Sequence, residues 1–240
     1  MTLSTFKKAP LVVALLIASS ASFAYYPPQA GYSGYYSMYS FMPAFYIGGQ
    51  GGYSRAIYDN RLNNEVQLYT SSSSTEGGLG GRVYAGVYFN PFFSAEVGYT
   101  QYADNDYKAT SGASSMDFNF ENYAWDISGK LTYPFGMSAP WLAPYSTYFK
   151  FGAAYMTTKF TKTGTLQPSF GTALASGKDT AWAPLIGIGA AVSFNPFIMM
   201  DVSWTRVFRT SGFNLQQFVT TGSSGTPDGD LFALGLTVTF

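Results

Sequence analysis

Eight segments in which bulky apolar residues alternate with small or polar ones predict an all-β chain. Two further observations indicate that the strands close into a barrel that spans a membrane. The bulky residues share one face throughout, and short turns alternate with long polar connections. We therefore expect an eight-stranded antiparallel up-and-down transmembrane β-barrel whose outer wall contacts lipid.

The first 24 residues predict an export signal peptide. Lys7 and Lys8 precede the apolar run LVVALLIA, and Ser22-Phe23-Ala24 offers small residues at the spacing that a signal peptidase reads. The run is too short for a membrane helix, which needs about 20 residues; the alternative is a buried N-terminal helix. Cleavage after Ala24 would remove two of 13 basic residues and leave 11 against 13 acidic ones, which predicts no nucleic-acid partner.

The rest of the chain divides into an extension and a barrel. Residues 25–44 are rich in Tyr, Pro and Gly without periodicity, which predicts an irregular N-terminal extension. The outer-membrane β-barrel is expected over residues 45–240. Its strands are expected at 45–58, 79–89, 92–102, 118–133, 145–160, 180–194, 197–208 and 230–240.

The facing pattern along each strand distinguishes a membrane barrel from a soluble one. The third strand places Val97 and Tyr99 opposite Glu96 and Gly98, so that small and charged residues face inward. The other strands repeat the pattern, with outward Val83, Val87, Ile127, Phe149, Ile188, Val202 and Leu234. A soluble lipocalin-like barrel has the reverse arrangement, because its interior is the apolar side.

Two kinds of connection alternate along the chain. Asn90-Pro91 and Asn195-Pro196 form tight turns in the similar strings FNPFFS and FNPFIM, and 134–144 is a slightly longer turn. Segments 59–78, 103–117, 161–179 and 209–229 are expected to be long polar loops. Short periplasmic turns and long extracellular loops are typical of outer-membrane barrels. An even strand number then places both termini in the periplasm.

Aromatic residues crowd the strand ends in a way that predicts two interfacial girdles. The periplasmic girdle is expected to contain Phe89, Phe92, Phe93, Tyr133, Phe135, Trp141, Phe194, Phe197 and Phe240. The outer girdle is expected to contain Tyr53, Tyr99, Tyr123, Trp125, Tyr155, Trp182, Trp204 and Phe208.

Three strings resemble the small eight-stranded outer-membrane barrels typified by the transmembrane domain of outer membrane protein A. They are the opening FYIGGQGGYS, the third-strand AEVGYTQY and the closing DLFALGLTVTF. The resemblance implies that Leu236, Val238 and Phe240 form the C-terminal signal read by the barrel-assembly machinery, a partner during biogenesis. It also implies a bacterial outer-membrane location. The peptidoglycan-binding domain of the archetype is not expected here.

Six charged residues are expected to face the lumen: Arg82, Glu96, Asp126, Lys130, Lys150 and Asp201. An eight-stranded barrel is just wide enough for side chains to fill, so these charges should pair and plug the lumen. The alternative is a gated ion path in which the partners exchange.

Two arginines depart from the inward rule. Parity sends Arg206 outward above Trp204, and Arg55 does the same on the first strand. Near the outer rim these guanidinium groups could contact lipopolysaccharide phosphates. The alternative is a β-bulge that restores inward facing.

The chain contains no His and no Cys, which excludes the usual histidine-dependent and thiolate catalysts and Cys/His metal sites. Asp104 and Asp106 lack the further ligands of a calcium loop. We therefore expect no enzymatic activity, cofactor or metal. Two classes remain: a structural or surface-interaction protein whose loops bind an unknown extracellular ligand, or a narrow channel or transporter for ions or small solutes.

Overall fold

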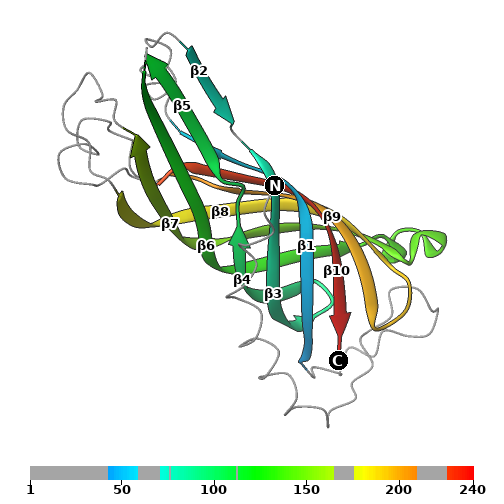
Figure 1. Cartoon of the computed structure of the whole chain (residues 1–240). Coiled ribbons are helices and arrows are strands. Elements are labelled where there is room, and N and C mark those ends of the chain that lie inside the picture. Colours follow the sequence, from blue (N-terminus) through cyan, green and yellow to red (C-terminus); the bar gives the residue numbers. More distant parts are fainter. Residues whose placement is uncertain (1–42, 59–70, 76, 112, 165–175, 210–225) are drawn as a thin grey trace.

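The computed structural model describes residues 43–58, 71–75, 77–111, 113–164, 176–209 and 226–240 (Figure 1). The expected signal peptide and almost all of the 25–44 extension lie outside the described residues. Among the described residues, no helix combines the length and apolar character that crossing a membrane would require.

The strands are β1 (Ala44–Ile57), β2 (Ser71–Thr75), β3 (Gly78–Asn90), β4 (Phe93–Gln101), β5 (Asn105–Ser111), β6 (Ser114–Pro134), β7 (Tyr145–Gly164), β8 (Ser176–Ser193), β9 (Ile198–Val207) and β10 (Asp228–Thr239). Two short 3-10 helices, η1 (Phe135–Met137) and η2 (Pro140–Leu142), connect β6 to β7.

Eight of these strands close into an antiparallel barrel, which confirms the predicted fold class. The order is β4-β3-β1-β10-β9-β8-β7-β6, and β6 pairs again with β4. The first and last strands meet along their length, from Tyr46↔Thr239 to Ile57↔Asp228. The end of the barrel that holds the β3–β4, β6–β7 and β8–β9 connections is called the turn end, and the opposite end the loop end.

Asparagine side chains stabilise the two tight turns. Asn90 Oδ1 accepts hydrogen bonds of 2.8 Å from the backbone N–H groups of Phe92 and Phe93. Asn195 Oδ1 accepts two bonds of the same length from Phe197 and Ile198. An Asn side chain that mimics a backbone turn in this way fixes the strand reversal, with proline in the next position.

The prediction of a loop over 103–117 is wrong, because this segment contains strand β5 and the start of β6. β5 pairs with β6 from Asn105↔Phe120 to Ser111↔Ser114, and β2 pairs with β5. The physical reason is an alternation hidden in a polar segment: Asn105 and Tyr107 are buried while Asp106 and Lys108 face solvent. β2, β5 and the adjoining part of β6 project at the loop end (Figure 1), and β7 continues beside β6 as far as Met116↔Gly164.

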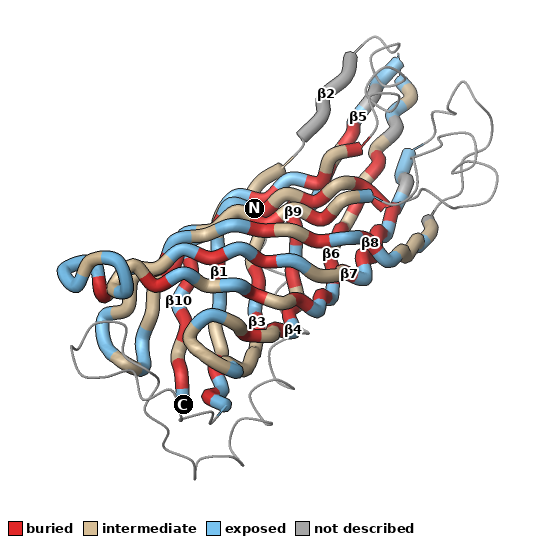
Figure 2. Tube along the Cα trace, turned by 180° about the vertical axis from the view of Figure 1, so that it is seen from behind, coloured by how far each residue is buried: buried red, intermediate tan, exposed pale blue. Residues whose placement is uncertain are grey.

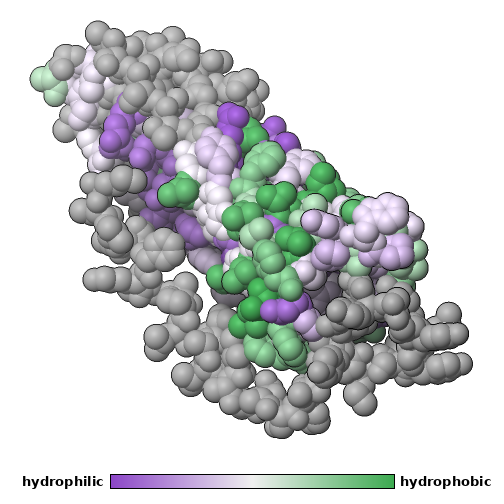
Figure 3. Space-filling view, turned by 90° about the vertical axis from the view of Figure 1, so that its right-hand side faces the viewer, coloured by the Kyte–Doolittle hydropathy of each residue, from purple (hydrophilic) through white to green (hydrophobic). Residues whose placement is uncertain are grey.

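Buried and exposed residues alternate along each barrel strand (Figure 2). On β4, Val97 is 56% exposed while Glu96 is 2% exposed. Large apolar side chains cover the outer wall, and one face shows them gathered across its middle, with hydrophilic residues toward the loop end (Figure 3). This arrangement confirms the expected inversion relative to a soluble barrel.

Two inward glycines make room for tyrosines that fill the barrel. A Cβ at Gly48 would overlap the ring of Tyr84, and one at Gly189 would overlap the ring of Tyr148. Because an interior this narrow packs side chains closely, a large ring on one strand requires a missing side chain on its neighbour.

Candidate functional site in the barrel lumen and at the outer rim

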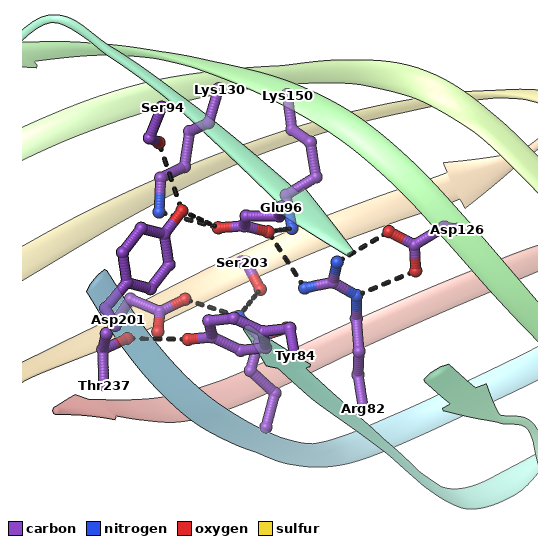
Figure 4. Close-up of polar contacts among 12 residues, drawn as sticks. Arg82, Tyr84, Ser94, Glu96, Asp126, Lys130, Lys150, Asp201, Ser203 and Thr237 are labelled. Atoms are coloured by element: carbon purple, nitrogen blue, oxygen red, sulfur yellow. Dashed lines mark hydrogen bonds and ion pairs between the residues drawn. The ribbon is translucent and has the colours of Figure 1, made fainter. Parts of the chain in front are cut away.

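Glu96 lies at the centre of the charged residues that the sequence places in the lumen (Figure 4). Its carboxylate is 2.8 Å from Lys130 Nζ on β6 and 2.8 Å from Lys150 Nζ on β7. Arg82 Nη1 on β3 lies 3.2 Å from the same carboxylate. Lys130 and Lys150 are directly opposite each other, so Glu96 screens two like charges that would otherwise repel.

Arg82 holds a second carboxylate at two points. Its Nη2 lies 2.7 Å from Asp126 Oδ1 and its Nε donates to Asp126 Oδ2 at 3.1 Å. Both side chains are fully buried, with exposed fractions of 0%. A paired, bidentate guanidinium is the arrangement that makes a buried ionic group tolerable inside a protein.

Asp201 is the member of the set without a cation in ion-pair range among the described residues. Its Oδ2 accepts hydrogen bonds of 2.7 Å from Gln50 Nε2 and from the Tyr148 hydroxyl. Its Oδ1 has no hydrogen-bond partner there, although Asp201 is 3% exposed. The structure thus brings five of the six residues into one ion-pair network and leaves Asp201 beside it.

Tyrosines complete this layer, and the sequence reasoning did not assign them a role. Tyr46 donates to Glu96 Oε1 at 3.1 Å, and Tyr84 shares a 2.7 Å bond with Thr237. Lys130 Nζ lies 4.9 Å from the Tyr46 ring centre and 5.1 Å from that of Tyr148, which are cation–π contacts. These tyrosines occupy inward positions of their strands, beside inward glycines on the neighbouring strands. That pattern is the sequence signal that could have identified them.

A second layer, closer to the loop end, is apolar, and sequence reasoning missed it. Side chains from five barrel strands and the end of β4 meet there in one buried cluster. Its large members, called the apolar layer below, are 0–3% exposed: Tyr102, Met156, Leu185, Val207 and Leu231. The sequence carries a signal for this layer, because Leu185 in the middle of β8, Val207 at the end of β9 and Leu231 near the start of β10 all have inward parity.

A third layer lies in the part of the sheet that projects beyond the apolar layer. It contains buried aromatic rings, namely Tyr58, Tyr107, Phe118, Phe120 and Phe160. Asn122 on β6 links one of these rings to β7, since its Oδ1 accepts bonds from the Tyr58 hydroxyl at 2.7 Å and from Thr158 at 2.9 Å. Burial raises the pKa of the Tyr58 hydroxyl above its usual range, which keeps it a hydrogen-bond donor.

Arg55 and Arg206 both face outward at the loop end, on either side of β10. Continuous register from Asp230↔Arg206 to Val238↔Ile198 rules out the alternative of a bulge at Arg206. Arg206 forms ion pairs with Asp228 at 3.1 Å and with Asp230 at 3.6 Å. A phosphate would therefore have to compete with two carboxylates for this guanidinium.

The C-terminal residues occupy the positions expected of the closing strand. Leu236 and Phe240 are exposed on the outer wall, at 51% and 45%, and Val238 shares their face at intermediate exposure. The backbone N–H of Phe240 donates to the carbonyl of Phe45 at 2.8 Å, so the last residue pairs with the first strand.

No cluster of three or more metal-ligating side chains occurs among the described residues. Asp104 and Asp106 lie at the loop end near Glu121. Partial burial of the Asp104 carboxyl and repulsion from Glu121 and Asp106 raise the pKa of Asp104 to about 6.

Known proteins resemble this chain in sequence and in fold. The chain is 28% identical over 226 residues to an uncharacterized protein of Coxiella burnetii (strain RSA 493 / Nine Mile phase I), covering 82% of this chain and 85% of that one. Neisserial surface protein A (NspA) shares the fold with a TM-score of 0.50 at 14% identity, over 82% of this chain and 97% of that one. A major outer membrane protein from Thermus thermophilus has a TM-score of 0.48 at 11% identity, covering 82% of this chain and 99% of that one.

The family model described as outer membrane protein beta-barrel domain matches residues 11–240, which include every described strand. The chain therefore belongs to the outer membrane protein beta-barrel family and is a protein of the bacterial outer membrane.

Proposed function

We propose that this protein is a closed outer-membrane anchor that presents its loop end at the cell surface, for adhesion or for envelope integrity. The observation that supports this most directly is the filling of the lumen at two levels. Ion-paired side chains occupy the half nearer the turn end, and the apolar layer follows toward the loop end. An apolar constriction excludes ions even where a polar layer below it could rearrange.

The orientation that we propose places the turn end, with the start of β1 and the end of β10, in the periplasm. The short connections support it, since periplasmic turns of such barrels are short. The projecting sheet of β2, β5 and β6 would then extend outside the cell, where the loops would bind an unknown ligand.

The proposal extends to the ends of the chain and to biogenesis. Residues 1–24 would be the signal peptide, and residues 25–44 the periplasmic extension. Leu236, Val238 and Phe240 would be the signal that the barrel-assembly machinery reads, because they present one apolar row on the outer face of the closing strand. The paired geometry of Phe240 with β1 supports a role in closing the barrel.

Two measurements test the proposal. Because the chain has no native Cys, Thr110→Cys adds one exposed thiol on β5. A membrane-impermeant maleimide should label that thiol on intact cells, and protection of the thiol until the cells are broken would contradict the orientation. Liposomes that contain the refolded protein should swell no faster in sugar solutions than empty liposomes, whereas rapid swelling would contradict a closed barrel.

A second candidate is a narrow channel or transporter. The observation that favours it is the imbalance within the charged layer: three cations share Glu96, whereas Asp201 has no cation in ion-pair range among the described residues. Partner exchange toward Asp201 would open the polar half of the lumen. Ion conductance that changes with Lys130→Met or Glu96→Gln would support this candidate, and unchanged conductance would exclude it.

A further inference from the structure

Two lysines face each other on the outer wall near the loop end. Lys159 on β7 pairs in register with Lys178 on β8, and both side chains are exposed. Residues directly opposite on neighbouring strands have Cβ atoms about 5 Å apart, and like charges in such positions destabilise the pair. An anion beside the two lysines would offset this repulsion.

The lumen shows how the same protein compensates such a pair. Lys130 and Lys150 are also directly opposite, and Glu96 lies within 2.8 Å of both. Among the described residues, no carboxylate lies in ion-pair range of Lys159 or Lys178. Glu121 is opposite Lys159 on β6 without forming an ion pair with it.

The lysine pair lies just beyond the outer aromatic row. Tyr155 and Trp182, directly opposite on the same two strands with ring centres 5.3 Å apart, are each four residues nearer the turn end. Four residues of a tilted strand correspond to a height of roughly 10 Å. Such aromatic residues mark the membrane interface, so the lysines reach the layer of lipid headgroups.

The side chain of Lys159 bends toward the membrane. Its Nζ lies 5.2 Å from the ring centre of Tyr123, which belongs to the aromatic row on β6. The ammonium group is therefore held near the interface by a cation–π contact. Because β7 lies between β6 and β8, the phosphate groups of one headgroup lying over β7 at this level would reach this ammonium group and that of Lys178 on β8.

We infer that Lys159 and Lys178 form a binding site for the phosphate groups of outer-leaflet lipopolysaccharide, with Tyr155 and Trp182 packing beneath the headgroup. The inference rests on the proposed orientation, which places this wall in the outer leaflet. It places the lipid contact on β7 and β8 and not on β1 and β9, the strands that carry Arg55 and Arg206. Arg206 already has carboxylate partners, whereas none of the described carboxylates pairs with the lysines.

The test is a titration of the refolded protein in detergent micelles with purified diphosphoryl lipid A, and with lipid A from which the phosphates have been removed. Wild-type protein should bind the diphosphoryl form more tightly, and added salt should weaken that binding. Lys159→Gln/Lys178→Gln should reduce the affinity roughly thirtyfold, from the loss of two ammonium–phosphate contacts.

Matched variants make the result specific. Lys108→Gln removes another exposed lysine, one that pairs with Asp117 at 3.5 Å, and should leave affinity unchanged. Wild-type affinity in the Lys159/Lys178 variant would overturn the inference, as would a loss confined to Arg55→Gln/Arg206→Gln. Unaltered heat-modifiable migration of each variant shows that the barrel still folds. Labelling of Thr110→Cys on intact cells separates failure of the orientation from failure of the site.

Discussion

Arg82 on β3 and Asp126 on β6 form a two-point ion pair that bridges the intervening strand β4 inside the barrel. Neither side chain is exposed. The pair therefore links three consecutive strands by side chains in addition to the backbone ladder. It adjoins the buried cluster that contains the apolar layer, since Ala124, the next inward residue of β6 toward the loop end, belongs to that cluster.

Asp126→Asn should destabilise the barrel strongly, because it leaves the Arg82 charge buried with one partner fewer. Breaking a buried pair from one side costs about 3–5 kcal/mol. The measurement is urea unfolding of the protein refolded into lipid vesicles. Lys108→Gln is the matched control, since that pair is exposed and should contribute less than about 1 kcal/mol. Equal effects of the two substitutions would contradict the structural role of the network.

Gly48→Ala should destabilise the barrel, whereas Gly51→Ala on the same strand should not. A Cβ at Gly48 would overlap the Tyr84 ring, while one at Gly51 would meet no atom within 4 Å. Overpacking a well-filled interior costs about 1–3 kcal/mol. The same unfolding measurement compares the two variants, and equal stabilities would show that Tyr84 does not fill the space beside Gly48.

The Asp104 carboxyl should make stability fall as the pH rises through about 6. Its folded-state pKa is raised to about 6, above the value near 4 of an unfolded chain. The folded protein therefore holds this proton more tightly, and the contribution of the Asp104 carboxyl to stability, complete below about pH 4, is lost between about pH 4 and 6. Asp104→Asn should remove that part of the pH dependence. A titration midpoint of the Asp104 carboxyl near its unfolded-chain value, read by NMR, would contradict this prediction.

The sequence was sufficient to predict which residues form the outer wall of the barrel, because all outward residues there face one uniform solvent, lipid. Residues such as Val97 and Ile127 follow a strict period of two, and Asn90 and Asn195 mark the turns by their own hydrogen bonds. The same pattern also predicted correctly that the polar face turns inward.

The interior was harder to predict, because its residues are selected by particular neighbours across the lumen. Which cation meets Glu96 depends on the stagger of the strands, which alternation alone does not give. The apolar layer was not predicted for a related reason: Leu185 and Leu231 are apolar residues on a face that was expected to be polar. Strand β5 was not predicted because Tyr107 is its sole large apolar residue.

Single-channel recording in planar bilayers tests the closed barrel most directly. Wild-type protein should add no measurable conductance, and Lys130→Met and Glu96→Gln should remain silent because the apolar layer is intact. Leu185→Ser combined with Leu231→Ser and Lys130→Met should admit current, since the apolar layer then carries polar side chains and the ion-pair network below it has lost one member. Resolved channels in the wild type that change with Lys130→Met alone would contradict the account, because the charged layer would then control an open path.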